Sequence, residues 1–290
     1  MLIDGKEISK KILKGISSDL RQISKKLGRS PALSIILIGN NPASETYVKA
    51  KITACNEVGI KGELIRFDVS VDSKTLMDEI YKLNNNSDID GILLQLPVPK
   101  NLDERELIEK INPLKDVDGL TTENIGFLNS GAPRFIPATP YGIMEIFNSI
   151  GVNLSGKKVV IIGRSNIVGR PLFSLMSGIG ENANSTVTLC HGYTENLSEF
   201  TLEADIIISA TGFVNIVDGS MIKEGAIVID VGINRVEDKS KKSGYRLIGD
   251  VDFKTVNKKA SYITPVPGGV GPMTIAMLMK NVCNAAKGVK

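Results

Sequence analysis

Short, almost continuously apolar segments alternate with amphipathic segments along this chain. The apolar segments lie at residues 33–38, 64–69, 89–96, 159–162, 186–189, 205–209, 226–231 and 261–264. Apolar residues recur at steps of three and four, the spacing of amphipathic helices, at residues 8–27, 44–58, 75–83, 102–111 and 142–150. Strands that are apolar on both faces are typical of parallel sheets with helices packed on either side. The pattern therefore predicts an α/β fold.

A Pro- and Gly-rich stretch at residues 131–142 divides this alternation into two halves. A chain of 290 residues also exceeds the length at which a single core usually stops growing. We therefore expect two α/β domains. Near the end of the chain, Pro272 fits the first turn of a terminal helix.

The composition limits the classes of partner and compartment. The net charge is only +3 and the lysines are scattered, so nucleic acid and anionic membranes are weak candidates. The first residues lack an apolar signal core, and no apolar run approaches the roughly 20 residues that span a bilayer. Cys55, Cys190 and Cys283 have neither disulfide nor zinc-ligand spacing, which fits a reducing compartment. We expect a cytoplasmic protein without a metal.

A glycine turn follows the first apolar segment of the second half. Gly163 permits a tight turn where the backbone can approach a pyrophosphate, and the first amides of a following helix favour an anion. The usual G-x-G-x-x-G pattern is absent, because Ser165 replaces the second glycine and the next glycine is Gly169. The spacing alone fits a dinucleotide site and an ordinary strand-to-helix turn equally well. Segments 204–212 and 226–233 end in small residues that leave room for a ligand, which favours the dinucleotide.

The next strand indicates which dinucleotide binds. An NAD site usually ends this strand with Asp or Glu, which holds the ribose hydroxyls. Here the strand ends Leu189-Cys-His-Gly192 without a carboxylate, and Arg164 could meet a 2′-phosphate. The sequence therefore favours NADP over NAD. His191 is the single histidine, which argues against Ser/His/Asp and Cys/His nucleophiles, and the alternative for it is a loop residue without a role.

Candidate chemical residues lie in the first half. Ser44, Tyr47 and Lys51 share one stripe of a helix, beside its buried face. A helical lysine is normally a solvated charge, so the spacing by itself does not make Lys51 catalytic. Gln95, at the carboxyl end of a strand, is either a ligand-binding amide or a strand-end cap. The two carboxylates within residues 115–119 either bind a ligand or fold back onto their own turn.

Five motifs together resemble the bifunctional methylenetetrahydrofolate dehydrogenase/cyclohydrolase family. They are Tyr47-Val-Lys-Ala-Lys51 with Cys55 one turn on, Gly91-Ile-Leu-Leu-Gln-Leu-Pro97, Lys115-Asp-Val-Asp-Gly119, Gly163-Arg-Ser-Asn-Ile-Val-Gly169 and Pro267-Gly-Gly-Val-Gly-Pro-Met-Thr274. They occur in the family's order and cover nearly the whole chain.

The resemblance implies two activities. One is the reversible NADP-dependent oxidation of 5,10-methylenetetrahydrofolate to the 5,10-methenyl form, and the other is hydrolysis of that product to 10-formyltetrahydrofolate. Both belong to one-carbon metabolism, which supplies purine, methionine and histidine biosynthesis. The family forms homodimers.

The resemblance also implies the domains. An N-terminal three-layer α/β catalytic domain, residues 1–138 plus 272–290, binds folate, and a Rossmann-like parallel-sheet domain, residues 139–271, binds NADP. The active site is expected in the cleft between the two domains.

Residue roles follow from the same resemblance. The catalytic residues would be Lys51, Gln95, Tyr47 and Asp118, with Lys51 as general acid/base and Gln95 as its hydrogen-bond partner. Folate would contact Tyr47, Ser44, Asp118, Pro267 and Gly268. NADP would contact Gly163, Arg164, Ser165, Ile167, His191, Gly192, Thr211, Gly212 and Ile233. A free lysine has a pKa of about 10.4, so acid/base work near neutrality requires the lower pKa that burial produces.

Two positions depart from the family's pattern. Ala138 replaces the usual Cys of a Pro-Cys-Thr-Pro segment, which we interpret as packing. Gly192 replaces a Ser that often follows Cys-His, and this removes one hydrogen bond to a 2′-phosphate. Two alternatives to the bifunctional enzyme stay open: a dehydrogenase without the hydrolytic step, and a non-catalytic dinucleotide-binding protein. The presence of Lys51, Gln95 and Asp118 argues against the second alternative.

Overall fold

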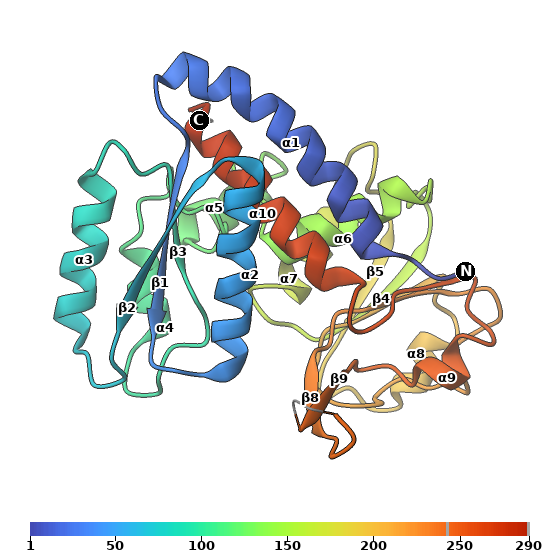
Figure 1. Ribbon diagram of the computed structural model, residues 1–290. Helices are drawn as coiled ribbons and strands as arrows, with labels where there is room; N and C mark the ends of the chain where they lie inside the picture. The colour runs from blue at the N-terminus through green and yellow to red at the C-terminus, as the bar shows by residue number, and fades with distance from the viewer. Residues whose placement is uncertain (242–243, 289–290) are drawn as a thin grey trace. The chain divides into compact units, whose positions relative to one another are not determined.

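The computed structural model describes residues 1–241 and 244–288. These residues form two compact units. The five-stranded unit comprises Met1–Ser9 and Thr139–Thr274, and the three-stranded unit comprises Lys10–Ala138 and Ile275–Lys290, of which residues 289 and 290 lie outside the described part. Helices α1 (Gly5–Leu27) and α10 (Val270–Ala286) each contain residues of both units (Figure 1).

The three-stranded unit is built on a parallel sheet with the strand order β2-β1-β3. Its remaining elements are β1 (Ala32–Ile38), α2 (Pro42–Val58), β2 (Lys61–Phe67), α3 (Ser73–Asn85), β3 (Gly91–Leu94), α4 (Glu104–Glu109) and α5 (Thr122–Asn129). One face of the sheet packs against the apolar side chains of α3 and α4, and α2 lies against the other face (Figure 1). The predicted three-layer α/β architecture is confirmed.

The five-stranded unit holds a parallel sheet with the strand order β10-β7-β6-β4-β5. Its elements are α6 (Ala138–Ser149, whose first residue belongs to the other unit), β4 (Lys158–Ile162), α7 (Gly169–Ser177), β5 (Thr186–Cys190), α8 (Leu197–Thr201), β6 (Ile206–Ser209), β7 (Ile227–Asp230), β8 (Asn234–Glu237), β9 (Tyr245–Ile248), α9 (Phe253–Val256) and β10 (Tyr262–Ile263). The strand order reverses between β4 and β6, and ligands of such sheets bind at the carboxyl ends of the strands beside this point. The predicted Rossmann-like parallel sheet is confirmed.

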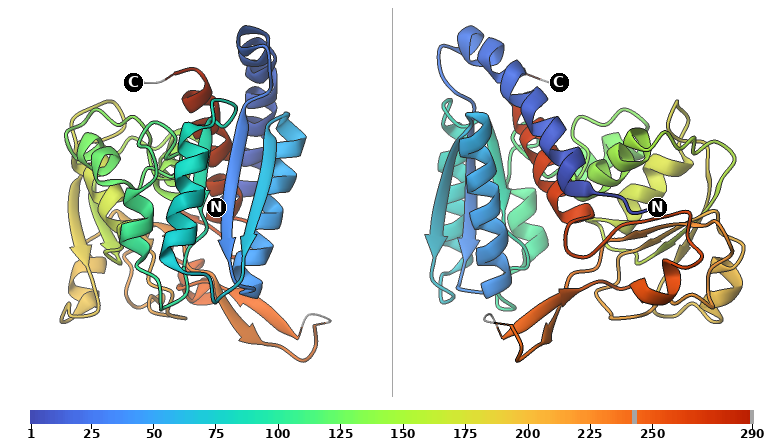
Figure 2. Two further views of the ribbon diagram at one scale, coloured as in Figure 1. Left: turned by 90° about the vertical axis from the view of Figure 1, so that its left-hand side faces the viewer. Right: turned by 45° about the vertical axis from the view of Figure 1, so that its right-hand side comes forward.

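Several elements were not predicted from the sequence. They are the antiparallel hairpin β8–β9, seen in orange in Figure 2, and the short helices α5, α8 and α9. Each hairpin strand is only four residues long and is interrupted by an arginine, Arg235 or Arg246, so neither forms a continuous apolar run. Short helices contain too few turns to establish a periodicity.

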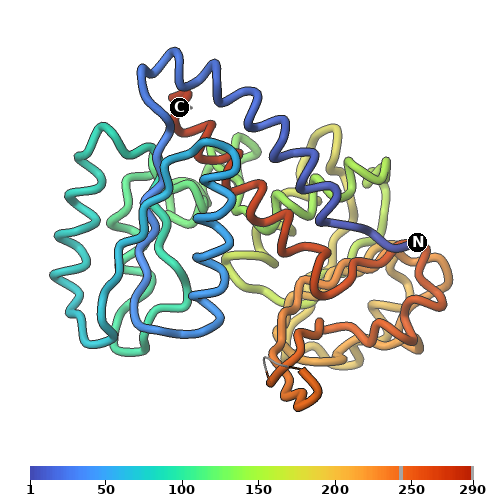
Figure 3. Tube along the Cα trace, viewed as in Figure 1, coloured from blue at the N-terminus to red at the C-terminus, as the bar shows by residue number. Residues whose placement is uncertain are grey.

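The first nine residues group with the five-stranded unit. Leu2 forms a parallel bridge with Ile263, and the N–H of Ile3 donates to the Ile263 carbonyl at 2.9 Å. The beginning of the chain thus extends the edge of the sheet next to β10 (Figure 3).

Helices with the length and apolar character needed to cross a membrane are absent from the described part of the chain.

Candidate active site and dinucleotide site

Helix α2 carries three of the predicted site residues. It begins where the Asn41 side chain accepts hydrogen bonds from the N–H groups of Ala43 and Ser44, at 2.8 and 3.4 Å. Ser44 and Lys51 are buried, and Tyr47 is half-buried. The predicted stripe therefore lies against the protein rather than in solvent.

Lys51 and Gln95 are brought together by the fold. The Lys51 ammonium donates a hydrogen bond of 2.9 Å to Gln95 Oε1. Gln95 follows β3, and its backbone N–H donates to the Ile36 carbonyl at 2.9 Å. Its side-chain Nε2 donates to the Leu96 carbonyl at 2.8 Å, which directs the amide oxygen toward the lysine. The ammonium thus has a neutral, oriented partner.

The segment that carries Asp118 runs alongside β3. Ile92 and Asp116 form a parallel bridge, and the Ile92 N–H donates to the carbonyl of Lys115 at 2.8 Å. The segment turns directly after this bridge, where the Val117 N–H donates to the Lys115 carbonyl at 2.9 Å and the Gly119 N–H donates to the Asp116 carbonyl at 3.0 Å. Asp118 lies in this turn and interacts electrostatically with Lys51, the hydrogen-bond partner of Gln95.

The two aspartates of this segment have different environments. Asp116 is buried, and its Oδ2 accepts hydrogen bonds from Thr121 N and Asn124 Nδ2 at 2.7 and 2.9 Å. Asp116 thus follows the alternative in which a carboxylate of this segment folds back onto its own turn. Asp118 is half-buried and interacts electrostatically with Lys51. Only Asp118 is thus placed to act on the lysine and on a ligand beside it.

Burial shifts both charged groups of this site toward their neutral forms. It lowers the pKa of Lys51, an effect that the negative charge of Asp118 partly opposes. It raises the pKa of Asp118, opposed by the charge of Lys51 and reinforced by that of Asp116. A lysine with a lowered pKa can release and take up a proton closer to neutral pH, as acid/base catalysis requires.

The glycine turn in the five-stranded unit fits a bound dinucleotide. Gly163 has φ +116°, and a Cβ there would lie 2.3 Å from the Ala210 carbonyl oxygen. A Cβ on Gly169, the first residue of α7, would lie 1.9 Å from the Gly163 carbonyl oxygen. The two glycines thus allow the helix to start directly against the strand, as in dinucleotide-binding turns. The Ser165 hydroxyl accepts from Val168 N at 3.2 Å, and both Ser165 and Ile167 are exposed.

Tyr193 connects two of the residues expected to contact NADP. The Arg164 guanidinium lies 5.8 Å from the centre of the Tyr193 ring. His191 Nδ1 accepts a hydrogen bond from Tyr193 N at 3.2 Å. Gly192 between them is exposed, and a Cβ there would meet no atom within 4 Å. The carboxyl end of β5 therefore has an open position at Gly192, and the Arg164 guanidinium lies over the ring of the next residue, Tyr193. As expected, the strand does not end with a carboxylate.

The remaining expected NADP contacts lie at the ends of β6 and β7. Thr211 is half-buried, while Gly212 and Ile233 are exposed. The N–H groups of Thr211 and Gly212 donate to the buried carboxylate of Asp250, at 2.6 and 3.2 Å. Sequence reasoning missed Asp250, because an aspartate after a short polar strand resembles an ordinary turn residue.

Two predicted substrate contacts belong to the other unit. Pro267 is exposed and Gly268 is half-buried with φ +112°, and both lie in the five-stranded unit. Their grouping with Tyr47 and Asp118, and the expected position of the active site between the domains, stay predictions.

Two family models match the chain over almost its full length. Residues 3–118 match the tetrahydrofolate dehydrogenase/cyclohydrolase catalytic domain, and residues 137–290 match the NAD(P)-binding domain of the same family. The chain belongs to the tetrahydrofolate dehydrogenase/cyclohydrolase family. The family predicted from the motifs is confirmed.

Relatives of the chain within this family are called bifunctional protein FolD. The protein from Bacteroides thetaiotaomicron is 48% identical and that from Flavobacterium johnsoniae 49% identical, each over 286 residues. These alignments cover 99% of this chain and 98% and 97% of the relatives.

Solved structures of the family have the same fold. The bifunctional methylenetetrahydrofolate dehydrogenase/cyclohydrolase FolD of Campylobacter jejuni is 46% identical, with a TM-score of 0.93 over 99% of each chain. The Trypanosoma brucei enzyme, solved in complex with NADP and an inhibitor, is 38% identical with a TM-score of 0.94, over 99% of this chain and 97% of its own.

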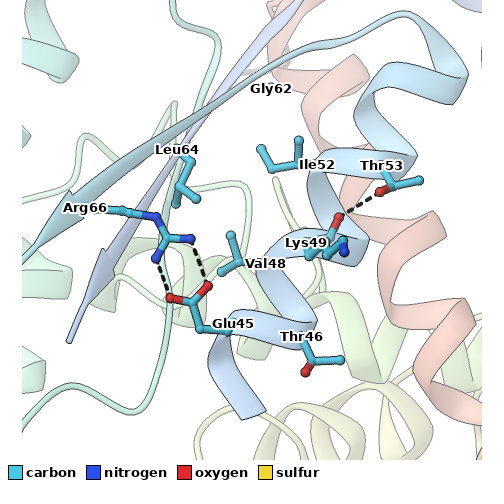
Figure 4. A pocket seen from close by; sticks show the side chains of 9 residues that line it. All are labelled: Glu45, Thr46, Val48, Lys49, Ile52, Thr53, Gly62, Leu64 and Arg66. Carbon is cyan, nitrogen blue, oxygen red and sulfur yellow. Dashed lines mark hydrogen bonds and ion pairs between the residues drawn. The ribbon is translucent and has the colours of Figure 1, made fainter. Parts of the chain in front are cut away.

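A cavity of about 460 Å³ lies on another face of α2 (Figure 4). It is lined by Glu45, Thr46, Val48, Lys49, Ile52, Thr53, Gly62, Leu64 and Arg66. Glu45 and Arg66 form an ion pair beside it. Helical geometry directs Lys49 and Thr53 away from the stripe of Ser44, Tyr47 and Lys51. This cavity is therefore separate from the candidate active site around Lys51.

Proposed function

We infer that this chain is a bifunctional enzyme that oxidises 5,10-methylenetetrahydrofolate with NADP and hydrolyses the resulting 5,10-methenyltetrahydrofolate to 10-formyltetrahydrofolate. The observation that carries this function is the 2.9 Å hydrogen bond from the buried Lys51 ammonium to Gln95, with Asp118 near enough to interact electrostatically with Lys51. This arrangement supports an acid/base role for Lys51. The chain is also 48% identical over nearly its full length to a bifunctional member of the family.

The five-stranded unit holds the cofactor in this proposal. NADP, when bound, supplies a hydride acceptor for the oxidation. The glycine turn at Gly163 and the Gly169 N–H at the start of α7 would hold the pyrophosphate. Arg164, beside His191 and Gly192, would hold the 2′-phosphate. Thr211, Gly212 and Ile233 would face the nicotinamide half, because the first strand pair of such a sheet takes the adenosine half.

Lys51 moves the proton in the hydrolytic step. Water attacks the methenyl carbon and must lose a proton, and the ring nitrogen that leaves that carbon must gain one. A buried lysine with a lowered pKa can perform both transfers. Gln95 keeps the ammonium in place without adding a charge, and Asp118 accepts hydrogen bonds from the pterin. Tyr47 packs its ring against the folate, and Ser44 adds a polar contact from the same stripe.

Further properties complete the proposal. The two functional domains correspond to residues 1–138 plus 272–290 and residues 139–271, with Pro267 and Gly268 as additional folate contacts. The protein forms a homodimer and uses neither nucleic acid nor a membrane as a partner. It works in the cytoplasm, where the free, buried thiols of Cys55, Cys190 and Cys283 stay reduced. Its products serve purine, methionine and histidine biosynthesis.

Two absorbance assays on one preparation test this function. The first supplies methylenetetrahydrofolate with NADP or NAD, and the second supplies methenyltetrahydrofolate alone. We expect reduction of NADP in preference to NAD, and loss of methenyltetrahydrofolate without any dinucleotide. Oxidation without hydrolysis would instead identify a dehydrogenase. NADP binding without either reaction would identify a non-catalytic dinucleotide-binding protein.

A further inference from the structure

Two buried aspartates meet at the carboxyl ends of β6 and β7 in the five-stranded unit. Asp230 is the last residue of β7 and is 4% exposed. Asp250 follows β9 and is 0% exposed. A buried carboxylate is costly unless several donors surround it, so the donors around this pair indicate what it does.

Asp250 accepts hydrogen bonds from three segments of the chain. Its Oδ2 accepts from the Ser209 hydroxyl at 3.2 Å, from N and Oγ1 of Thr211 at 2.6 and 2.9 Å, and from Gly212 N at 3.2 Å. Its Oδ1 accepts from Asn234 Nδ2 at 3.1 Å. One carboxylate thus joins the end of β6, the loop after it and the first residue of β8.

Asp230 fixes the backbone around Asp250. Its Oδ1 accepts from the N–H groups of Gly232 and Asp250 at 3.0 and 2.9 Å, and its Oδ2 accepts from Val251 N at 3.0 Å. Asp250 is therefore held by its own backbone while its side chain holds the neighbouring loops.

Two glycines leave the space for these carboxylates. A Cβ on Gly232 would lie 1.9 Å from Asp250 Oδ1, and a Cβ on Gly249 would lie 1.8 Å from Asp230 Oδ2. Both glycines lie outside the range of φ that excludes other residues, so their requirement comes from close approach alone. The backbone therefore approaches the two aspartates so closely that a side chain would not fit at either glycine.

We propose that Asp250 is a positioning residue for the dinucleotide: it sets the places of Thr211, Gly212 and the Ile233–Asn234 segment at the nicotinamide end of the cofactor site. This inference rests on the proposed function. Asp250 controls NADP binding and the oxidation, because its donors lie at the strand ends that face the nicotinamide half. It leaves the hydrolysis unaffected, because Lys51, Gln95 and Asp118 belong to the other unit.

The test compares Asp250→Asn with Asp252→Asn. Asp252 is a nearby half-exposed aspartate whose side chain caps α9 and accepts from Lys254 N and Thr255 Oγ1. Asp250→Asn removes the charge. It replaces the two carboxylate oxygens with one amide oxygen and one NH2 group, and the NH2 group cannot accept a hydrogen bond. We expect its Kd for NADP, measured by calorimetry without folate, to rise more than tenfold. The KM for NADP should rise in parallel, while hydrolysis of methenyltetrahydrofolate stays within twofold of wild type.

A second readout needs no cofactor. Hydrogen exchange of the peptide containing Thr211 and Gly212 should be faster in Asp250→Asn than in wild type, because both amides lose a carboxylate acceptor and keep at most a neutral amide oxygen, which is a weaker acceptor. Asp252→Asn should leave this peptide and the Kd for NADP unchanged. An Asp250→Asn variant with wild-type exchange and wild-type Kd would overturn the proposal, as would one that loses both activities in equal proportion while folded.

Ser209→Ala keeps the proposal testable if Asp250→Asn does not fold. It removes one hydroxyl donor and leaves the carboxylate, so we expect a severalfold rise in the Kd for NADP with normal hydrolysis. An unchanged Kd in this variant, with Asp250→Asn unfolded, would reduce Asp250 to a structural residue and overturn the proposal. A wild-type protein without either activity would instead overturn the proposed function.

Discussion

At the scale of single residues, Lys51 combines a buried ammonium with a neutral hydrogen-bond partner. Most lysines on helices are solvated, and the burial of this one has a free-energy cost that the proposed acid/base role explains. Gln95 orients the ammonium without the upward pull on its pKa that a carboxylate at the same position would exert. Asp118 exerts a weaker pull of that kind than the burial it opposes.

Lys51→Met is expected to abolish hydrolysis. Methionine keeps an unbranched stem of similar length and removes the proton carrier, and positioned acid/base groups contribute about 10² to 10⁴ in rate. Oxidation should fall less, because hydride transfer depends more on orientation than on a proton. Both rates are measured on one preparation, with NADP affinity by fluorescence as the control for folding. Normal hydrolysis by this variant would remove Lys51 from the mechanism.

The same variant should change how stability depends on pH. Burial lowers the pKa of folded Lys51 below its ordinary value of 10.5, so between the folded pKa and 10.5 the unfolded chain binds more protons. The free energy of unfolding of the wild type therefore increases as pH rises through that window. Below the window, the buried charge of Lys51 destabilises the folded state by its full amount. Each unit of depression corresponds to about 1.4 kcal/mol.

We expect Lys51→Met to be more stable than wild type at pH 7, with a difference that shrinks toward pH 10.5. Urea unfolding at several pH values measures it. Lys49→Met, on the exposed face of α2, is the matched control and should show no such trend. A constant difference between Lys51→Met and wild type across this range would contradict a depressed pKa of Lys51.

Gly192→Ser should strengthen the preference for NADP. A Cβ at this position meets no atom within 4 Å, so serine fits, and its hydroxyl would lie near Arg164 at the end of β5. We expect the KM for NADP to fall severalfold while that for NAD stays the same. Arg164→Ala should have the opposite effect and raise the KM for NADP far more than that for NAD. Equal changes for both dinucleotides would show that this strand end does not contact the 2′-phosphate.

At the scale of elements, the start of α7 is a junction of the proposed cofactor site where two backbone segments approach closely. The strand β4 reaches Gly163, and the helix begins at Gly169 directly against its carbonyl. The Arg170 N–H donates to the Ser165 carbonyl at 3.1 Å and Pro171 has no N–H, so the Gly169 N–H is the amide of this first turn that we expect to face an anion. The close approach of two backbones here requires glycine.

Gly169→Ala should weaken NADP binding and destabilise the five-stranded unit. Its Cβ would lie 1.9 Å from a backbone oxygen, which cannot move without displacing the turn. Gly15→Ala, in α1 where a Cβ meets nothing within 4 Å, is the matched control. It should stabilise the protein by up to about 1 kcal/mol, the difference in helix propensity. Calorimetric titration with NADP and urea unfolding measure both effects, and normal binding by Gly169→Ala would show that the turn tolerates a side chain.

At the scale of the whole molecule, the proposed cofactor contacts from Gly163 to Ile233 and the proposed catalytic residues Lys51, Gln95 and Asp118 belong to different compact units. A ligand that binds one folded unit should therefore stabilise that unit first. NADP at a hundred times its Kd is expected to stabilise the folded state by about 2.7 kcal/mol. Scanning calorimetry should show this as a rise in the transition of the five-stranded unit, with a smaller rise for NAD at the same concentration. No shift with NADP would contradict the cofactor assignment.

The sequence alone determined the family, the fold class and the candidate residues. Apolar strands, helical periodicity and contiguous motifs such as those around Lys51 and Gly163 are local properties, so they can be read without the fold. Local patterns could not separate Asp116 from Asp118, because that distinction depends on the hydrogen bonds of Asp116 to Thr121 and Asn124 and on the nearness of Asp118 to Lys51. They also gave no signal for Asp250, whose donors come from residues 16 to 41 positions earlier in the chain.

Tertiary structure decided those points. The first nine residues group with the five-stranded unit because Leu2 pairs with Ile263 of β10, a contact between segments that are far apart in the sequence. The pKa of Lys51 is lowered because α2 is packed so that its ammonium is buried, which a helical stripe only suggests. Burial, register and long-range hydrogen bonds arise from the packing of distant segments, and only the folded chain specifies them.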